Sequence, residues 1–382
     1  MDVKQPLPLL GSLNPEQFMK RHWQKKPLVI RQAIPGFKAL LDRVELFALA
    51  ARDEVESRVV SRGSKGWQLR RGGPMPRRAL PPLKQRDWTL LVQGVDLHHE
   101  GVHKLLQQFR FVPEARMDDL MISYATDGGG VGAHFDSYDV FLLQAHGQRR
   151  WRIGRQKDLR LQRGVPLKIL ANFSPEEEFV LDPGDMLYLP PRYAHDGEAI
   201  GECMTYSIGF RAPQRAELAR ELLPRMVEDV VDAAGSPLYR DPGQAATGQP
   251  GEIPPALLAY AHDALMDVFK DPRSLPRALG EYLTEPKDNV WFDPVRAPSV
   301  MRSVVLDRRT RMMFDAHHVF INGESYRASG RDAALMRQLA DQRRLDTRTL
   351  QRGSAGALAL LQEWCEAGWL HDSHEGGSVA GA

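Results

Sequence analysis

The pattern of hydrophobic and polar positions changes at about residue 118 and again at about residue 211. Before residue 118 the pattern is mixed, and Asn14 with Gln17 forms a capping-box signature that predicts a helix running to Trp23. A stretch rich in Gly and Pro, 72–86, predicts an irregular surface loop. The other predicted elements are strands at 26–30, 54–63, 67–71 and 88–92 and helices at 42–52 and 97–109.

Between residues 118 and 210, short apolar or alternating runs are separated by Gly and Pro. Regularly spaced short strands with turn signals indicate a β-sandwich or barrel. The predicted strands are 121–125, 140–143, 150–153, 179–181, 186–189 and 204–210.

After residue 210 the pattern becomes helical, and later it becomes mixed again. The segment 236–255 is rich in Gly, Pro and Gln and predicts a linker or long loop. Asn322-Gly323 predicts a tight hairpin turn between two strands. A β-hairpin with two or three helices is consistent with a winged-helix-like module. The predicted helices are 214–234, 256–270, 274–284, 333–342 and 355–370, and the predicted strands are 304–314 and 318–328.

Composition and charge place the chain among ordinary globular proteins. Its 382 residues suggest two or three domains. With 51 basic and 49 acidic side chains the net charge is +2, so no global charge drives the chain onto nucleic acid or a membrane, although a local basic face is compatible with this balance. No signal peptide is expected in the first ten residues, and no run approaches the roughly 20 apolar residues of a membrane span. Two distant cysteines, Cys203 and Cys365, suggest no disulfide framework, so we expect a reducing compartment such as the cytoplasm.

The most informative motif is GGGVGAHFDSYDVFLLQAHG, residues 128–147, which contains His134 and Asp136. Residues two apart on a strand point to the same face, so an imidazole and a carboxylate would lie side by side. His195, in DPGDMLYLPPRYAHDGEA, is the candidate third ligand. Two His and one carboxylate form the facial triad of non-heme Fe(II) oxygenases, although such ligands also suit Mn(II), Co(II) or Zn(II). A single H-x-D is common by chance, and it is the pairing of two such blocks in one all-β segment that predicts a metal site.

A 2-oxo-dicarboxylate would need a cation for its distal carboxylate, and Arg149 is the candidate. By strand alternation Arg149 shares a face with Trp151 and Ile153, which is the more apolar face and therefore the inner one. A buried arginine requires an anion, and its planar guanidinium matches a carboxylate bidentately. The alternative is a structural ion pair with an internal Asp or Glu. Ser123, on a preceding strand, could add a hydroxyl to the same carboxylate.

The two blocks resemble the paired cupin motifs, and MISYATDGGGVGAHFDSYDVFLLQAHGQRRWRIG resembles the JmjC-type ribosomal oxygenases, in particular the bacterial ribosomal protein arginine hydroxylases. The resemblance implies an α+β chain with a double-stranded β-helix core, a helical dimerisation region and a C-terminal winged-helix-like domain. The expected bounds are 1–211 for the catalytic domain, with its core at 88–211, then 212–290 and 291–382.

For the site, the resemblance implies Fe(II) on His134, Asp136 and His195, with 2-oxoglutarate held by Arg149 and Ser123. It implies hydroxylation, with dioxygen, at the β-carbon of an arginine in the sixteenth protein of the large ribosomal subunit, by a homodimer. Tyr138, Asp139 and Asp127 are open candidates for holding the substrate side chain.

Three alternatives remain from the sequence. The same chemistry could act on a lysine or histidine. A transcription regulator with a cupin sensor would need a basic recognition helix, for which only the arginines of 337–352 offer material, and these more often form a solvated face. A Zn or Mn cupin isomerase would work without dioxygen or 2-oxoglutarate. We expect no direct binding to nucleic acid and no membrane contact.

Overall fold

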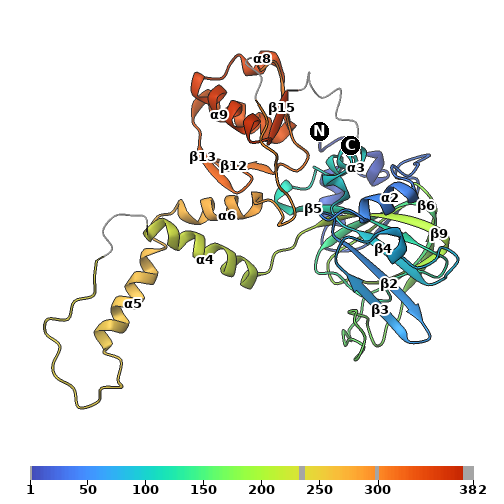
Figure 1. Ribbon diagram of the computed structural model, residues 1–382, viewed down its shortest axis with the longest axis horizontal. Helices are drawn as coiled ribbons and strands as arrows, with labels where there is room; N and C mark the ends of the chain where they lie inside the picture. The colour runs from blue at the N-terminus through green and yellow to red at the C-terminus, as the bar shows by residue number, and fades with distance from the viewer. Residues whose placement is uncertain (1, 232–236, 297–300, 373–382) are drawn as a thin grey trace. The chain divides into compact units, whose positions relative to one another are not determined.

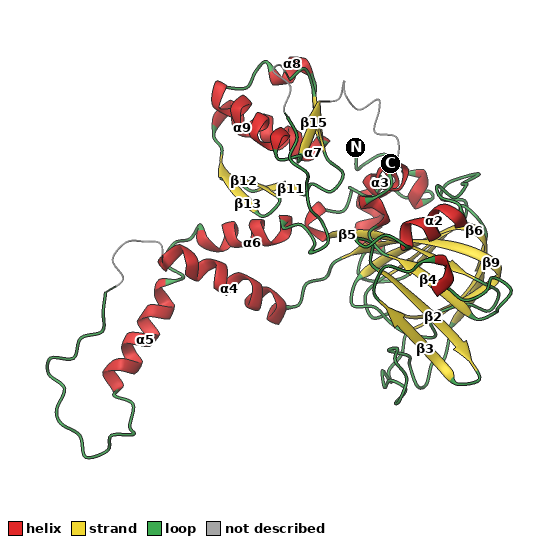
Figure 2. Cartoon of the chain, in the orientation of Figure 1, coloured by secondary structure: helices red, strands yellow, loops and turns green. Residues whose placement is uncertain are grey.

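An antiparallel sheet of nine strands forms the framework of the first part of the chain in this computed structural model, which describes residues 2–231, 237–296 and 301–372 (Figures 1 and 2). The chain divides into two compact units, Met1–Ala212 and Pro213–Ala382. The sheet has the order β1-β8-β6-β9-β5-β4-β2-β3, and β7 pairs with β6. Its strands are β1 (Leu28–Ile30), β2 (Ser57–Gly63), β3 (Gly66–Arg71), β4 (Trp88–Val92), β5 (Met117–Ala125), β6 (Asp139–Gly154), β7 (Glu177–Leu181), β8 (Met186–Leu189) and β9 (Ala194–Phe210).

Short helices pack against this sheet and share one hydrophobic core with it. The predicted capping box is confirmed, because the Asn14 side chain accepts from the Gln17 backbone at 2.8 Å and the Gln17 side chain accepts from the Asn14 backbone at 3.1 Å. Behind this cap, Phe18 packs on Phe141 and Tyr188 with ring centroids 5.3 and 4.9 Å apart, which fixes the first helix to the sheet. The helices are α1 (Pro15–Arg21), α2 (Arg43–Ala50), α3 (Glu100–Gln107), and the 3-10 turns η1 (Pro8–Leu10), η2 (Arg77–Ala79), η3 (Val95–Leu97) and η4 (Glu114–Arg116).

Two long strands, β6 and β9, correct the sequence prediction. The runs 140–143 and 150–153 were predicted as separate strands, but both belong to β6, which pairs with β9 over almost its full length. The register shifts around His146, where Gly147 has φ +60° and lies so close to β9 that a Cβ there would be 2.1 Å from the Glu202 carbonyl oxygen. A glycine therefore lets the strand continue through the irregularity. Strand β9 begins at Ala194, ten residues before the predicted strand, so His195 lies within it.

The second unit contains three helices followed by two small sheets with further helices, and the predicted α+β character is confirmed. A predicted strand at 304–314 is wrong, because Asp307 binds the backbone and side chain of Arg309 and turns the chain between two strands that join different sheets. The predicted 355–370 helix ends at Glu366, and residues 232–234 of the predicted 214–234 helix lie outside the described residues. The elements are α4 (Arg215–Val231), α5 (Pro255–Asp267), α6 (Ser274–Thr284), β10 (Val304–Leu306), β11 (Met312–Phe314), β12 (His318–Ile321), β13 (Glu324–Arg327), α7 (Gly330–Gln342), β14 (Arg344–Leu345), α8 (Thr347–Leu350), α9 (Ala355–Glu366) and β15 (Leu370–Asp372).

Candidate metal and cosubstrate site

The structure brings His134, Asp136 and His195 together. One ligand atom from each lies within 4.8 Å of the others, and within residues 2–231, 237–296 and 301–372 no other group of three His, Cys, Asp or Glu side chains meets this criterion. The Asp136 Oδ2 atom is 3.8 Å from His134 Nε2 and 3.6 Å from His195 Nε2. These separations allow one divalent ion to bind all three atoms on one side, which leaves its opposite side open.

The backbone positions both imidazoles. His134 and His195 form an antiparallel bridge, in which each backbone N–H donates to the other's carbonyl, at 2.9 and 2.8 Å. Each ring also places Nδ1 at a carbonyl oxygen: His134 at 2.8 Å from Gly132, and His195 at 3.0 Å from Tyr193. An Nδ1–H that donates to a carbonyl leaves Nε2 as the lone-pair nitrogen, which is the tautomer a metal requires.

Burial keeps His195 neutral. Its side chain is 4% exposed, and burial, followed by the neighbouring His134, lowers the pKa of His195 to about 4. The ring is therefore deprotonated near neutral pH without any metal, and a cation does not have to displace a proton from this ligand.

Arg149 is a buried cation without a carboxylate partner. It is 5% exposed, its Nε has no hydrogen-bond partner, and its guanidinium lies 3.6 Å from the Cys203 sulfur and 5.7 Å from the Trp151 ring centroid. The alternative of an internal ion pair with Asp or Glu is not supported, because within the described chain no carboxylate lies within ion-pair distance of Arg149. Burying an unpaired guanidinium is costly, so the arrangement indicates an anionic ligand.

The strand register places Arg149 on the same side as the metal ligands. Along β6, Arg149, Trp151 and Ile153 pair with Ala199, Gly197 and His195 of β9, so the three lie on the face that carries His195. Ile153, which pairs with His195, is four residues beyond Arg149 on β6, so Arg149 and His195 are separated by about 13 Å along the strand. Two side chains, a metal ion and a five-carbon diacid would together fill such a span.

Ser123 lies on β5 within the same sheet. It is buried, and its hydroxyl donates to the Thr205 carbonyl at 3.3 Å. It pairs with Thr205 of β9, whose own hydroxyl donates to Gln144 at 2.9 Å. Two residues after Ser123 on β5, Ala125 pairs with Cys203, the cysteine that contacts Arg149. Ser123 and Ala125 lie on the same face of the sheet, so Ser123 is two residues along the strand from the level of Cys203.

Sequence reasoning missed Cys203 and the role of Trp151. The Trp151 ring lies 5.9 Å from His195 and has a buried Nε1 without a partner, so it lines the space between the cation and the metal ligands. Gly197 allows this position, because a Cβ there would be 2.7 Å from the indole ring. The alternation on β6 already placed Trp151 beside Arg149, whereas Cys203 is 54 residues away and its contact depends on the β6–β9 register.

The three open candidates for substrate contact separate clearly. Asp139 is fully buried, accepts from Tyr188 at 2.6 Å and lies in the core, and Asp127 pairs with Arg86 at 2.5 Å. Tyr138 is 38% exposed beside the metal ligands, and burial of its hydroxyl with the nearby Asp136 charge raises its pKa. Of the three, Tyr138 alone is placed to meet a substrate.

Comparison with known proteins adds two family matches. A JmjC domain model matches residues 104–218, and a ROXA-like winged-helix model matches residues 263–371. The chain is 35% identical over 291 residues to the ribosomal protein uL16 3-hydroxylase of Escherichia coli, which covers 75% of this chain and 76% of that protein. It is 36% identical over 211 residues to a probable ribosomal oxygenase of Haemophilus influenzae, covering 54% and 52% of the two chains.

Solved structures agree with these matches. An X-ray structure of Escherichia coli YcfD superposes with a TM-score of 0.81 at 30% identity, covering 94% of this chain and 98% of that one. The same ribosomal oxygenase in complex with cobalt and 2-oxoglutarate gives a TM-score of 0.77, also at 30% identity and with the same coverage.

Proposed function

The chain belongs to the JmjC-type ribosomal oxygenases, as its motifs predicted, and we propose that it hydroxylates the β-carbon of an arginine in ribosomal protein uL16. It is a 2-oxoglutarate-dependent dioxygenase with the predicted JmjC cupin and winged-helix architecture. The observation that carries the site assignment is the buried, unpaired Arg149 on the same sheet face as the His134, Asp136 and His195 triad.

We assign Fe(II) to the triad. Two neutral imidazoles and a carboxylate suit this ion, and Nε2 of each histidine is available because Nδ1 is engaged with the backbone. When bound, Fe(II) supplies the oxidative decarboxylation of 2-oxoglutarate by dioxygen, which yields succinate and carbon dioxide and puts the second oxygen atom on the substrate carbon. The protein contributes the fixed donor geometry, with His195 and Arg149 both buried.

We assign the distal carboxylate of 2-oxoglutarate to Arg149, with Ser123 as a second donor. The guanidinium offers a planar pair of N–H groups, and Cys203 and Trp151 hold it without neutralising it. The indole Nε1 of Trp151 provides one more donor on the way to the metal. A diacid with a shorter chain could not bind the metal and the Arg149 guanidinium at the same time.

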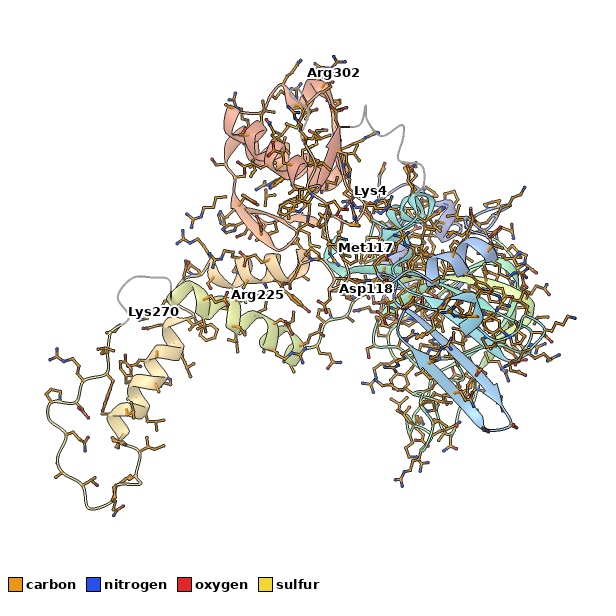
Figure 3. All side chains as sticks on the ribbon, in the orientation of Figure 1. Lys4, Met117, Asp118, Arg225, Lys270 and Arg302 are labelled. Atoms are coloured by element: carbon orange, nitrogen blue, oxygen red, sulfur yellow. The ribbon has the colours of Figure 1, made fainter. Side chains whose placement is uncertain are left out.

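The surroundings of Tyr138 suit a cationic substrate side chain. The carboxylates of Asp118 and Asp119 lie near enough to Tyr138 to contribute to its raised pKa, after burial and Asp136. Asp118 is labelled at the start of β5 in Figure 3, where it pairs with Arg211 at 3.1 Å. An aromatic face with neighbouring carboxylates is how a protein recognises a guanidinium.

The regulator alternative requires a basic recognition helix. In the second unit, α8 and α9 are consecutive helices, and if they served as a helix-turn-helix, α9 would be the helix that enters a DNA groove. Helix α9 reads AGALALLQEWCE and carries two Glu but no Lys or Arg. The arginines at 337–352 lie on or beside α7 and α8 instead. We infer that this module does not read duplex DNA.

A homodimer is the state we propose for the chain. Helix α5 and the residues after it expose large apolar side chains at helical spacing, with Leu258 and Leu265 both 66% exposed and Phe269 54% exposed. A face of this kind on a surface helix is typical of an interface with a second copy. No described helix has the length and apolar composition needed to cross a bilayer. We propose the cytoplasm as the site of action because the proposed substrate is a ribosomal protein.

Mass spectrometry tests the proposal. Escherichia coli uL16 would be incubated with the protein, Fe(II), 2-oxoglutarate and air, with the His134→Ala variant as the control. We expect one added oxygen atom on an arginine, and none with the variant. Oxygen on a lysine or histidine would retain the chemistry and reject the arginine assignment. No oxygen on any ribosomal protein, together with no succinate formation, would reject the proposed function.

A further inference from the structure

The positive charge of the first unit is concentrated in one segment. Residues 57–86 contain nine Lys and Arg and no Asp or Glu, although the whole chain has a net charge of only +2. We call this segment the basic hairpin; it consists of β2, β3 and the loop that follows, and Figure 1 shows β2 and β3 at one edge of the sheet. Its basic residues are Arg58, Arg62, Lys65, Arg70, Arg71, Arg77, Arg78, Lys84 and Arg86.

This charge is not neutralised within the described chain. Of the nine, only Arg86 forms an ion pair, with Asp127. Every one except Arg58 is exposed. The other partners of these side chains are neutral, as where Arg70 donates to the Ala79 carbonyl. A stretch of like charges without counter-ions is unfavourable on its own, and it produces a strong local potential that attracts anions.

The sheet register connects the basic hairpin with the proposed active site. Thr205 pairs with Ser123, Ser123 with Leu91, Leu91 with Arg58, and Arg58 with Arg71. Residues paired across strands lie on one face, so Arg58 and Arg71 continue the row that holds Ser123 out to the edge of the sheet. Arg58 also contributes to the electrostatic surroundings of Tyr138.

Trp67 fixes the hairpin against the metal-binding loop. A Cβ on Gly132, two residues before His134, would be 3.1 Å from the Trp67 ring, so the indole packs directly on this glycine. The guanidinium of Arg62 lies over the same ring, 5.4 Å from its centroid. Arginines interleaved with a partly exposed aromatic ring are typical of surfaces that bind the backbone and bases of single-stranded nucleic acid.

We propose that the basic hairpin is an RNA-binding surface, which contacts the phosphates of RNA carried by the substrate ribosomal protein. The proposal rests on the proposed function. The target arginine is itself a cation, so the hairpin repels it and must serve another ligand. Seven of the nine residues are Arg, whose forked guanidinium binds phosphate bidentately. This surface revises our expectation of no direct nucleic-acid binding, which rested on net charge.

Fluorescence anisotropy with a labelled single-stranded RNA of about 20 nucleotides tests this inference, using the full chain without metal or 2-oxoglutarate. The variant is Lys65→Glu with Arg71→Glu, whose side chains make no hydrogen bond or ion pair in the described chain. The matched control is Arg348→Glu with Arg352→Glu, which are exposed in the second unit and change the net charge equally.

We expect the hairpin variant to bind RNA at least about tenfold more weakly than wild type at 100 mM KCl. Its plot of log affinity against log salt should be shallower by about 1.4, because each lost phosphate contact contributes about 0.7 for a single strand. The control variant should bind within about twofold of wild type. Thermal unfolding of both variants would verify that they are folded.

Three results would overturn the inference: no salt-dependent binding by wild type, equal losses in the two variants, or equally tight binding of a polyglutamate chain of the same charge. The last result would identify an acidic protein as the partner. Since RNA binding is measured without turnover, its failure is distinct from failure of the hydroxylation experiment.

Discussion

Replacing Arg149 by Met should make the protein more stable and its cosubstrate binding weaker. The Arg149 side chain is 5% exposed, and no carboxylate of the described residues pairs with it. An uncompensated buried charge destabilises the folded state, and an apolar side chain of similar length relieves roughly 1–3 kcal/mol. For a unit of about 200 residues, at about 2–4 °C per kcal/mol, this corresponds to an increase in Tm of about 2–12 °C.

The same substitution should weaken the binding of 2-oxoglutarate. Arg149→Met removes two charge-assisted hydrogen bonds worth about 1.5–3 kcal/mol each. At about 1.4 kcal/mol per factor of ten, the Kd for 2-oxoglutarate should rise at least about 100-fold. Calorimetric titration of 2-oxoglutarate into the protein loaded with Mn(II) measures the Kd, and scanning fluorimetry in EDTA measures the Tm.

Arg152→Met is the matched control. Arg152 lies on the other face of β6 and pairs with Asp196 at 3.3 Å and Glu198 at 2.7 Å. Its loss should leave the Kd for 2-oxoglutarate within about threefold of wild type and should lower the Tm slightly, because Asp196 loses its ion pair and Glu198 keeps only the longer one, with Arg150 at 3.9 Å. If Arg149→Met also lowers the Tm, or binds 2-oxoglutarate with unchanged affinity, the assignment of this arginine to the cosubstrate is wrong.

Four further outcomes follow from the geometry. Asp136→Ala should weaken Co(II) binding at least about 100-fold, measured by calorimetry, and unchanged binding would exclude the triad as the metal site. Gly147→Ala should cost about 2–4 kcal/mol in denaturant unfolding, because its Cβ would lie 2.1 Å from a backbone oxygen at φ +60°; a loss below about 1 kcal/mol would contradict that close approach. Leu265→Asp should give a monomer in size-exclusion chromatography with light scattering, whereas a wild-type monomer would refute the dimer. Saturating 2-oxoglutarate should slow alkylation of Cys203 but not of Cys365, by mass spectrometry; equal protection would mean that the cosubstrate does not lie beside Cys203.

The sequence predicted those parts of the site that depend on local spacing. Arg149 could be assigned to the inner face because Trp151 alternates with it on β6, which needs only the geometry of one strand. His134 and Asp136 do lie close together, but the expectation that they share a strand is wrong: both precede β6, and His134 forms only the isolated bridge with His195. The same reasoning could not show that Asp139, next to Tyr138, points into the core, because that depends on Tyr188 from a different strand.

The parts that could not be predicted depend on pairing between distant segments. Strand β9 begins at Ala194 because it finds a partner in β6, whereas the predicted strand began only at residue 204. The contact between Arg149 and Cys203 follows from the same register. Likewise, the basic hairpin was first assigned to strands and a loop, and its relation to the site became visible only through the row from Ser123 to Arg71.

The reciprocal backbone bridge between His134 and His195 has a consequence for metal selection. Because backbone hydrogen bonds align the two imidazoles before an ion binds, the positions of these two ligands change little between different metal ions. A rigid site of nitrogen and oxygen donors ranks divalent ions by their intrinsic preferences, in which Fe(II) stands below Co(II), Ni(II) and Cu(II). Discrimination must then come from outside the protein, so the iron supply of the cell, rather than the fold, would decide how much of this enzyme is active.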